Sequence, residues 1–107
     1  MADTLRVGIA GLGTVGGAVF RLLGEKAAHV AARAGRAVTV TAVSARDPSR
    51  DRGLDFSGVS WFDDPTALAE TAEIDLFVEL IGGDGDPADG AVRAALKRGI
   101  PVVTANK

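Results

Sequence analysis

Apolar positions along this chain of 107 residues follow two alternating patterns, which predict strands and helices in turn. Short and nearly continuous apolar runs are typical of strands that are buried on both faces. Such runs fall at residues 5–10, 38–44, 59–62, 76–81 and 100–105. Between them apolar residues recur at helical spacing, first at Val15, Val19, Leu22 and Leu23. The pattern predicts elements in the order β-α-β-β-α-β-α-β.

Two of the predicted helices begin at the same signal, an aspartate N-cap followed by a proline at the first helical position. The two dipeptides are Asp64-Pro65 and Asp86-Pro87. The first helix of this pair is expected to reach about Thr71. The second should cover residues 88–98 and end at Gly99, after a basic last turn.

Strands that alternate with helices form parallel sheets with right-handed crossover connections. The predicted fold class is therefore α/β: a Rossmann-type doubly wound parallel sheet of about five strands, with helices on both faces. The chain length suits a single domain, residues 1–107. The helix after the first strand is expected to stop at Gly35, and Gly24 leaves a break within it open.

Composition narrows the classes of function. The hydrophobic fraction of 47% and the charged fraction of 24% are ordinary for a globular domain, and the net charge of −2 gives no basic field for nucleic acid. The absence of cysteine excludes disulfides and thiolate metal sites, and no His, Asp and Glu cluster has metal-ligand spacing. Neither a signal sequence nor a run of about 18 apolar residues is present. We therefore expect a cytoplasmic protein without a metal, nucleic-acid or membrane partner.

A glycine-rich turn between the first strand and the first helix carries the strongest chemical signal. Its glycines have the G-x-G-x-x-G spacing of dinucleotide-binding folds, in the strand–turn–helix context that this motif requires. The backbone N–H groups of such a turn bind a pyrophosphate, and the Thr14 hydroxyl adds a contact or caps the helix. Ordinary turn glycines are the structural alternative. The expected phosphate-binding residues are Gly11, Leu12, Gly13, Thr14, Val15 and Gly16.

The end of the second predicted strand determines the choice of cofactor. An acidic residue there binds the ribose 2′-hydroxyl of NAD, whereas an arginine accommodates the 2′-phosphate of NADP. This chain has no acid at that point and places Arg46 directly after the strand. The alternative is a solvated loop, because Asp47 and Asp51 neutralise part of the local charge. The sequence favours NADP and leaves NAD possible.

Three segments of the chain resemble the amino-terminal part of homoserine dehydrogenases. Residues 11–16 resemble the nucleotide loop of that family. Residues 79–83, followed by Pro87-Ala88, resemble the segment under the nicotinamide, and residues 102–107 resemble the strand that ends in the family's signature lysine. The resemblance implies NAD(P)-dependent interconversion of L-homoserine and L-aspartate 4-semialdehyde, in threonine, methionine and isoleucine biosynthesis.

The resemblance also implies individual roles. Gly82 and Gly83 would let the nicotinamide ribose lie against backbone, although ordinary turn glycines explain them almost as well. Thr104 and Lys107 would contact the cofactor, and Lys107 would take the catalytic part in proton transfer. Glu79 lies in an apolar strand and so requires a hydrogen-bond partner; the resemblance makes it structural support near the site rather than a catalytic acid.

Homoserine dehydrogenases continue into a dimerisation and substrate domain, which this sequence lacks. We therefore expect an excised cofactor-binding domain of a homo-oligomeric parent, which binds a nicotinamide dinucleotide without turnover and needs the other domain for its small-molecule substrate. In that case Lys107 is homologous but non-functional here. Two alternatives remain: a non-catalytic dinucleotide-binding or interaction module that self-associates through its last strand, and the cofactor domain of another small-metabolite dehydrogenase.

Overall fold

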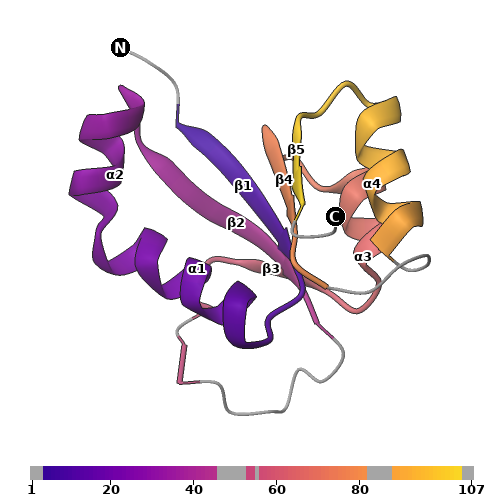
Figure 1. Ribbon diagram of the computed structural model, residues 1–107, viewed down its shortest axis with the longest axis horizontal. Helices are drawn as coiled ribbons and strands as arrows, with labels where there is room; N and C mark the ends of the chain where they lie inside the picture. The colour runs from indigo at the N-terminus through magenta and orange to yellow at the C-terminus, as the bar shows by residue number, and fades with distance from the viewer. Residues whose placement is uncertain (1–3, 46–52, 55, 82–87, 105–107) are drawn as a thin grey trace.

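The computed structural model describes residues 4–45, 53–54, 56–81 and 88–104, which form a parallel sheet between helices (Figure 1). The strands are β1 (Leu5–Ala10), β2 (Val38–Ser44), β3 (Ser60–Phe62), β4 (Leu76–Glu79) and β5 (Val102–Thr104). The helices are α1 (Thr14–Glu25), α2 (Ala27–Ala34), α3 (Pro65–Thr71) and α4 (Ala88–Lys97). All strand pairs are parallel, in the order β3-β2-β1-β4-β5. The predicted fold class is confirmed.

Helices pack on both faces of the sheet. The α1 and α2 helices lie against β1 and β2 on one face, and α3 and α4 lie together on the opposite face (Figure 1). The strand order reverses at β1, because β2 and β3 follow on one side of it while β4 and β5 lie on the other. In doubly wound sheets, ligands bind at the carboxyl ends of the strands beside such a reversal. The topology therefore selects the carboxyl ends of β1 and β4.

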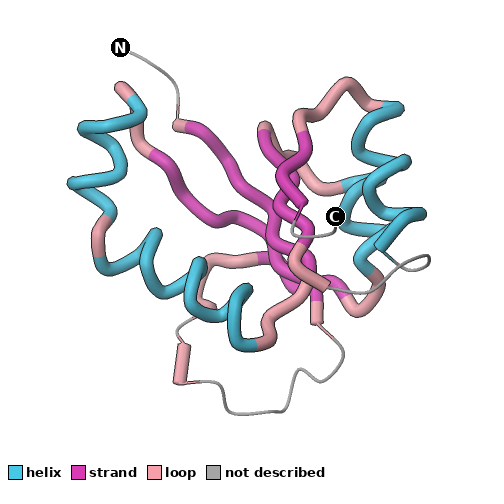
Figure 2. Tube along the Cα trace, viewed as in Figure 1, coloured by secondary structure: helices cyan, strands magenta, loops and turns pink. Residues whose placement is uncertain are grey.

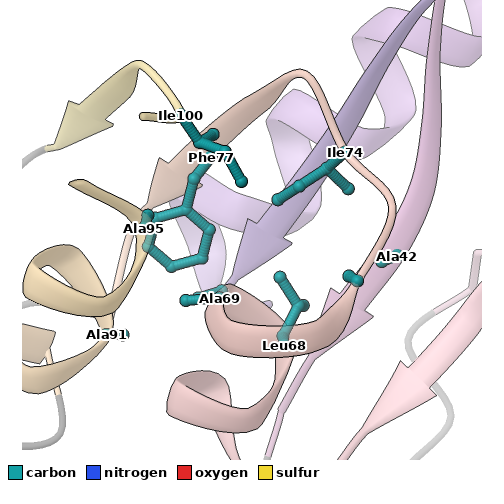
Figure 3. Close-up of a cluster of buried hydrophobic side chains, with 10 residues drawn as sticks. Ala42, Leu68, Ala69, Ile74, Phe77, Ala91, Ala95 and Ile100 are labelled. Carbon is teal, nitrogen blue, oxygen red and sulfur yellow. The ribbon is translucent and has the colours of Figure 1, made fainter. Parts of the chain in front are cut away.

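Phe77 is the centre of the apolar core on the α3–α4 face. It is fully buried and points from β4 toward Ala69 of α3 and Ala95 of α4 (Figure 3). Leu68 and Ile100 are buried in the same cluster. The small alanine side chains let both helices come close to the sheet, and one aromatic ring fills the space between them.

Most of the predicted helix ends are confirmed. The Asp64 Oδ1 accepts a hydrogen bond from the Thr66 backbone N–H at 2.9 Å, as expected of an N-cap, and α3 starts at the following proline. Gly35 ends α2 in the left-handed conformation, with φ of 78°. The α4 helix ends at Lys97, one residue earlier than predicted. The proposed start at Asp86-Pro87 lies outside the described residues.

The strands β3, β4 and β5 are shorter than the apolar runs that predicted them. β3 begins at residue 60 rather than 59, and β4 ends at 79 rather than 81. β5 begins at 102 rather than 100, and residue 105 lies outside the described residues. Apolar residues beside a strand therefore continue the buried layer after the ladder of backbone hydrogen bonds has stopped.

The first predicted helix is two helices, α1 and α2, joined by a turn (Figure 2). The break lies at Lys26, whose backbone N–H still bonds to the Leu22 carbonyl at 2.9 Å. Gly24, where the sequence allowed a break, is inside α1. Glycine permits a break there, but the rest of the fold does not require one.

The predicted apolar stripe of α1 is partly wrong. Val15 and Leu22 are 57% and 52% exposed, although their spacing placed both on one apolar stripe. Gly16 lies on the buried side of α1, and Phe20 packs against the core on the same side. The close approach of Gly16 to the sheet therefore sets the rotation of the helix, which apolar spacing alone did not.

Hydrogen bonds between Arg6 and Asp75 join the start of β1 to the residue before β4. Asp75 Oδ2 accepts hydrogen bonds from the Arg6 backbone N–H at 2.8 Å and from Arg6 Nε at 3.1 Å. Asp75 Oδ1 accepts another from Arg6 Nη2 at 3.2 Å. The hydrogen bonds from the Arg6 side chain and backbone lower the pKa of Asp75 from 3.8 to about 2. The folded protein thus favours the ionised carboxylate.

This shift predicts a specific loss of stability in acid. A depressed pKa contributes stability above the unfolded value of 3.8, and that contribution disappears as the pH falls toward about 2. We expect the urea midpoint of the wild-type chain to fall more steeply across this interval than that of Asp75→Asn. Equal slopes for the two proteins would show that folding does not lower the pKa of Asp75.

Candidate functional site

The carboxyl ends of the five strands lie in one register row across the sheet. Ala10 at the end of β1 is paired with Ser44 of β2 and with Glu79 of β4. Ser44 is paired in turn with Phe62 of β3, and Glu79 with Thr104 of β5. The residues directly after β1, β2 and β4 therefore lie side by side, at the edge where this fold class binds ligands.

Gly11, the first residue after β1, occupies a position that only glycine fits. Its φ is +98°, and a Cβ there would lie 2.8 Å from both the carbonyl carbon and the carbonyl oxygen of Leu80. Its N–H donates to the Ser44 carbonyl at 2.8 Å, and the Leu80 N–H donates to the Ala10 carbonyl at the same distance. The turn is thus held between the ends of β2 and β4.

Gly16 lets α1 approach that turn. A Cβ at Gly16 would lie 1.8 Å from the Gly11 carbonyl oxygen, a distance at which no side chain fits. Because the obstructing atom is backbone, it cannot move away as a flexible side chain would. The residue is also buried, so the first turn of the helix rests directly on the turn after β1.

Gly13 has the opposite environment. It is the N-cap of α1, with φ of −73° and ψ of −155°, and no described atom lies within 4 Å of the position a Cβ would take. The Thr14 cap considered from the sequence is therefore wrong, because Thr14 is the first residue inside the helix and Gly13 occupies the capping position without a side chain. Bare backbone faces open space at this corner.

The N-terminus of α1 offers donors for an anion. The Gly17 N–H bonds to the Gly13 carbonyl at 2.8 Å, the first bond of the helix, so the preceding amides have no intrahelical acceptor. No hydrogen bond joins the Thr14, Val15 or Gly16 amides to another described residue. The first turn of the helix has no acidic residue that would repel an anion. This cradle fits a diphosphate, since it joins free amides, the positive end of a helix dipole and space for close approach.

Glu79 and Thr104 meet beside this corner. The Glu79 side chain is fully buried at the end of β4, and its Oε2 accepts a hydrogen bond from the Ile81 N–H at 2.7 Å. Its Oε1 accepts one from the Thr104 hydroxyl. The sequence required a partner for this carboxyl group, and the structure confirms that it has one.

The structure brings together only part of the predicted site. The glycine turn lies against the Leu80 backbone, and Thr104 lies across Glu79 from it. Thr104 and Glu79 are 25 residues apart in sequence, so no local pattern pointed to this pair beyond the buried acid itself. The predicted site residues outside the described part of the chain are Arg46, Gly82, Gly83 and Lys107.

Other features of the described residues point away from this corner. A pocket of about 510 Å³ lies between α1 and the first residues of β2, where Phe20, Leu23, Val38 and Val40 contribute to its walls. It is at the opposite end of β2 from the register row, so it is not the candidate site. Within the described ranges, no three His, Cys, Asp or Glu side chains are grouped to hold a metal. None of the described helices has the length and apolar character to cross a membrane.

The family model and the relatives of higher identity belong to one family. The family model described as "Homoserine dehydrogenase, NAD binding domain" matches residues 11–107. The homoserine dehydrogenase of Pseudomonas aeruginosa is 44% identical over 105 residues, which cover 96% of this chain and 23% of that protein. The crystal structure of a homoserine dehydrogenase from Thiobacillus denitrificans matches 97% of this chain and 24% of its own, with a TM-score of 0.84 and 38% identity.

The crystal structure of the S. aureus homoserine dehydrogenase at pH 7.0 matches all of this chain and 27% of its own, with a TM-score of 0.85 and 29% identity. This chain therefore spans about a quarter of the length of the relatives that it matches.

Proposed function

Because this chain belongs to the NAD-binding domain family of homoserine dehydrogenases, we propose that it binds a nicotinamide dinucleotide across the carboxyl ends of its strands. The observation that carries this proposal is the corner formed by Gly11, Gly13 and Gly16. There the Thr14, Val15 and Gly16 amides have no hydrogen-bond partner among the described residues, and no described atom lies within 4 Å of a Cβ placed on Gly13. The amides from Leu12 to Gly16 and the dipole of α1 would hold the diphosphate.

We propose that recognition of the 2′-phosphate determines the preference between NADP and NAD. β2 ends at Ser44 without an acidic residue, and Arg46 follows two residues later. A charge-assisted hydrogen bond from an arginine contributes about 1.5–3 kcal/mol, roughly ten- to a hundredfold in affinity. We therefore propose that NADP is preferred and that NAD binds more weakly.

The reaction proposed for the whole protein is hydride transfer between L-homoserine and L-aspartate 4-semialdehyde, a step of threonine, methionine and isoleucine biosynthesis in the cytoplasm. The bound cofactor would supply or accept the hydride. Gly82 and Gly83 would hold its nicotinamide half, Thr104 would support that half at the end of β5, and Lys107 would move a proton at its Nζ atom. A substrate and dimerisation domain outside this chain would hold the second reactant. Because both reactants must share one geometry, this chain alone should bind without turnover.

Titration calorimetry with NADPH and NADH tests the proposal on the chain as it stands. We expect NADPH to bind at a single site, with a dissociation constant at least about tenfold lower than that of NADH. Tighter binding of NADH would contradict the role of Arg46 in recognising the 2′-phosphate. No heat with either compound would contradict the proposed function. Homoserine oxidation by this chain at enzymatic rates would contradict the need for a second domain.

A further inference from the structure

The fully buried carboxyl group of Glu79 has no part in holding the diphosphate. It lies at the end of β4, and its side chain shares a face with Phe77, inside the apolar layer that α3 and α4 cover. Burying a charged or strongly polar group lowers stability unless hydrogen bonds compensate, and an apolar residue of similar size is often neutral or better. Hydrophobic packing therefore gives no reason for a glutamate at this position.

The hydrogen bonds of Glu79 provide a reason for a glutamate at this position. Oε2 holds the Ile81 N–H at 2.7 Å, two residues beyond it, and Oε1 holds the hydroxyl of Thr104 on the neighbouring strand. One side chain thus fixes the backbone that leaves β4 relative to the end of β5. Glu79 and Thr104 are themselves paired in the β4–β5 ladder, and their side-chain hydrogen bond ties the two strand ends together in addition to the main-chain pairing.

The backbone that Glu79 holds is a wall of the glycine corner. A Cβ on Gly11 would lie 2.9 Å from the Ile81 nitrogen, the same atom that donates to Glu79. In this fold class the adenosine half of a dinucleotide lies over the end of β2, so the other half extends over β4 and β5. Glu79 and Thr104 are the last residues of β4 and β5, where that second half would lie.

We propose that Glu79 and Thr104 form a positioning pair that shapes the nicotinamide half of the crevice and leaves the adenosine half unaffected. The pair acts through the Ile81 backbone and the end of β5, so neither residue is catalytic in this role. The inference rests on the proposed dinucleotide function. It predicts that breaking the pair weakens binding of the whole cofactor and spares a ligand that lacks nicotinamide.

Thr104→Val tests the pair with little risk to the fold, because Thr104 is exposed and valine has the same shape. We expect its dissociation constant for NADPH to rise about tenfold, while that for 2′-phospho-ADP-ribose stays within about twofold of wild type. Thr104→Ser keeps the hydroxyl and should restore NADPH affinity. Thr71→Val removes a hydroxyl that bonds to Ala67 on α3, and it serves as the matched control.

A double-mutant cycle separates positioning from direct contact with the ligand. Glu79→Leu removes both acceptors, so adding Thr104→Val should raise the NADPH dissociation constant no further. Glu79→Gln keeps an acceptor for Ile81 and a partner for Thr104, and it should retain NADPH affinity. Additive losses would show that Thr104 touches the cofactor independently, which would overturn the inference.

Two further outcomes would also overturn it. Equal weakening of NADPH and 2′-phospho-ADP-ribose by Thr104→Val would indicate general loosening of the fold, and unchanged affinity for both would remove any role for the pair. Failure of the wild-type chain to bind either ligand would overturn the proposed function as well. That result is distinguishable because it appears before any substitution is made.

Discussion

Gly16→Ala is expected to lower the free energy of unfolding by about 3 kcal/mol, which corresponds to a fall in Tm of about 12 °C or more. The added Cβ would lie 1.8 Å from the Gly11 carbonyl oxygen. Either the turn after β1 or the first turn of α1 must therefore move. Since Gly11 is itself confined by the Leu80 backbone, the displacement spreads to the end of β4. Thermal unfolding followed by circular dichroism measures the loss.

Gly24→Ala is the matched control, because it makes the same change in the same helix. No described atom lies within 4 Å of a Cβ at Gly24, and alanine is the better residue in a helix interior. We expect this variant to be more stable than wild type by about 0.5–1 kcal/mol. If both alanines changed Tm alike, the close contact at Gly16 would not limit the fold.

Gly13→Ala is expected to weaken NADPH binding by about thirtyfold while leaving the fold intact. The Cβ meets no described atom, and the backbone conformation at Gly13 is one that alanine adopts, so stability should change by less than about 1 kcal/mol. The methyl group would instead occupy the space through which a diphosphate reaches the amides of α1. A loss of about 2 kcal/mol in charge-assisted hydrogen bonding corresponds to this change in affinity.

Binding of 2′-phospho-ADP-ribose, which lacks nicotinamide, distinguishes the effect of Gly13→Ala from that of breaking the Glu79–Thr104 pair. Gly13→Ala should weaken 2′-phospho-ADP-ribose as much as NADPH, because both carry the diphosphate. Thr104→Val should weaken NADPH alone. Wild-type affinity of Gly13→Ala for both ligands would place the diphosphate elsewhere and remove the main support for the proposed function.

Local patterns in the sequence predicted most of the fold. The boundaries of β1 and β2 agree with the apolar runs that predicted them, and Asp64 caps α3 as expected. Such features depend on residues that are neighbours in the chain, so their side chains and backbone preferences can be interpreted directly. The same holds for the glycine spacing at residues 11–16, whose physical basis is a turn of a few residues.

The sequence by itself thus determined the order of the strands, the parallel sheet and the glycine turn at which we propose that a phosphate binds. Only the tertiary structure decided how α1 is rotated, why Gly11 and Gly16 tolerate no side chain, and which group satisfies the buried Glu79. Each of these depends on atoms from elements that are distant in the chain and meet only when the strands align. Periodicity along one segment contains no information on the element that will lie against it, and for that reason the contacts at the ends of β1, β4 and β5 required the folded chain.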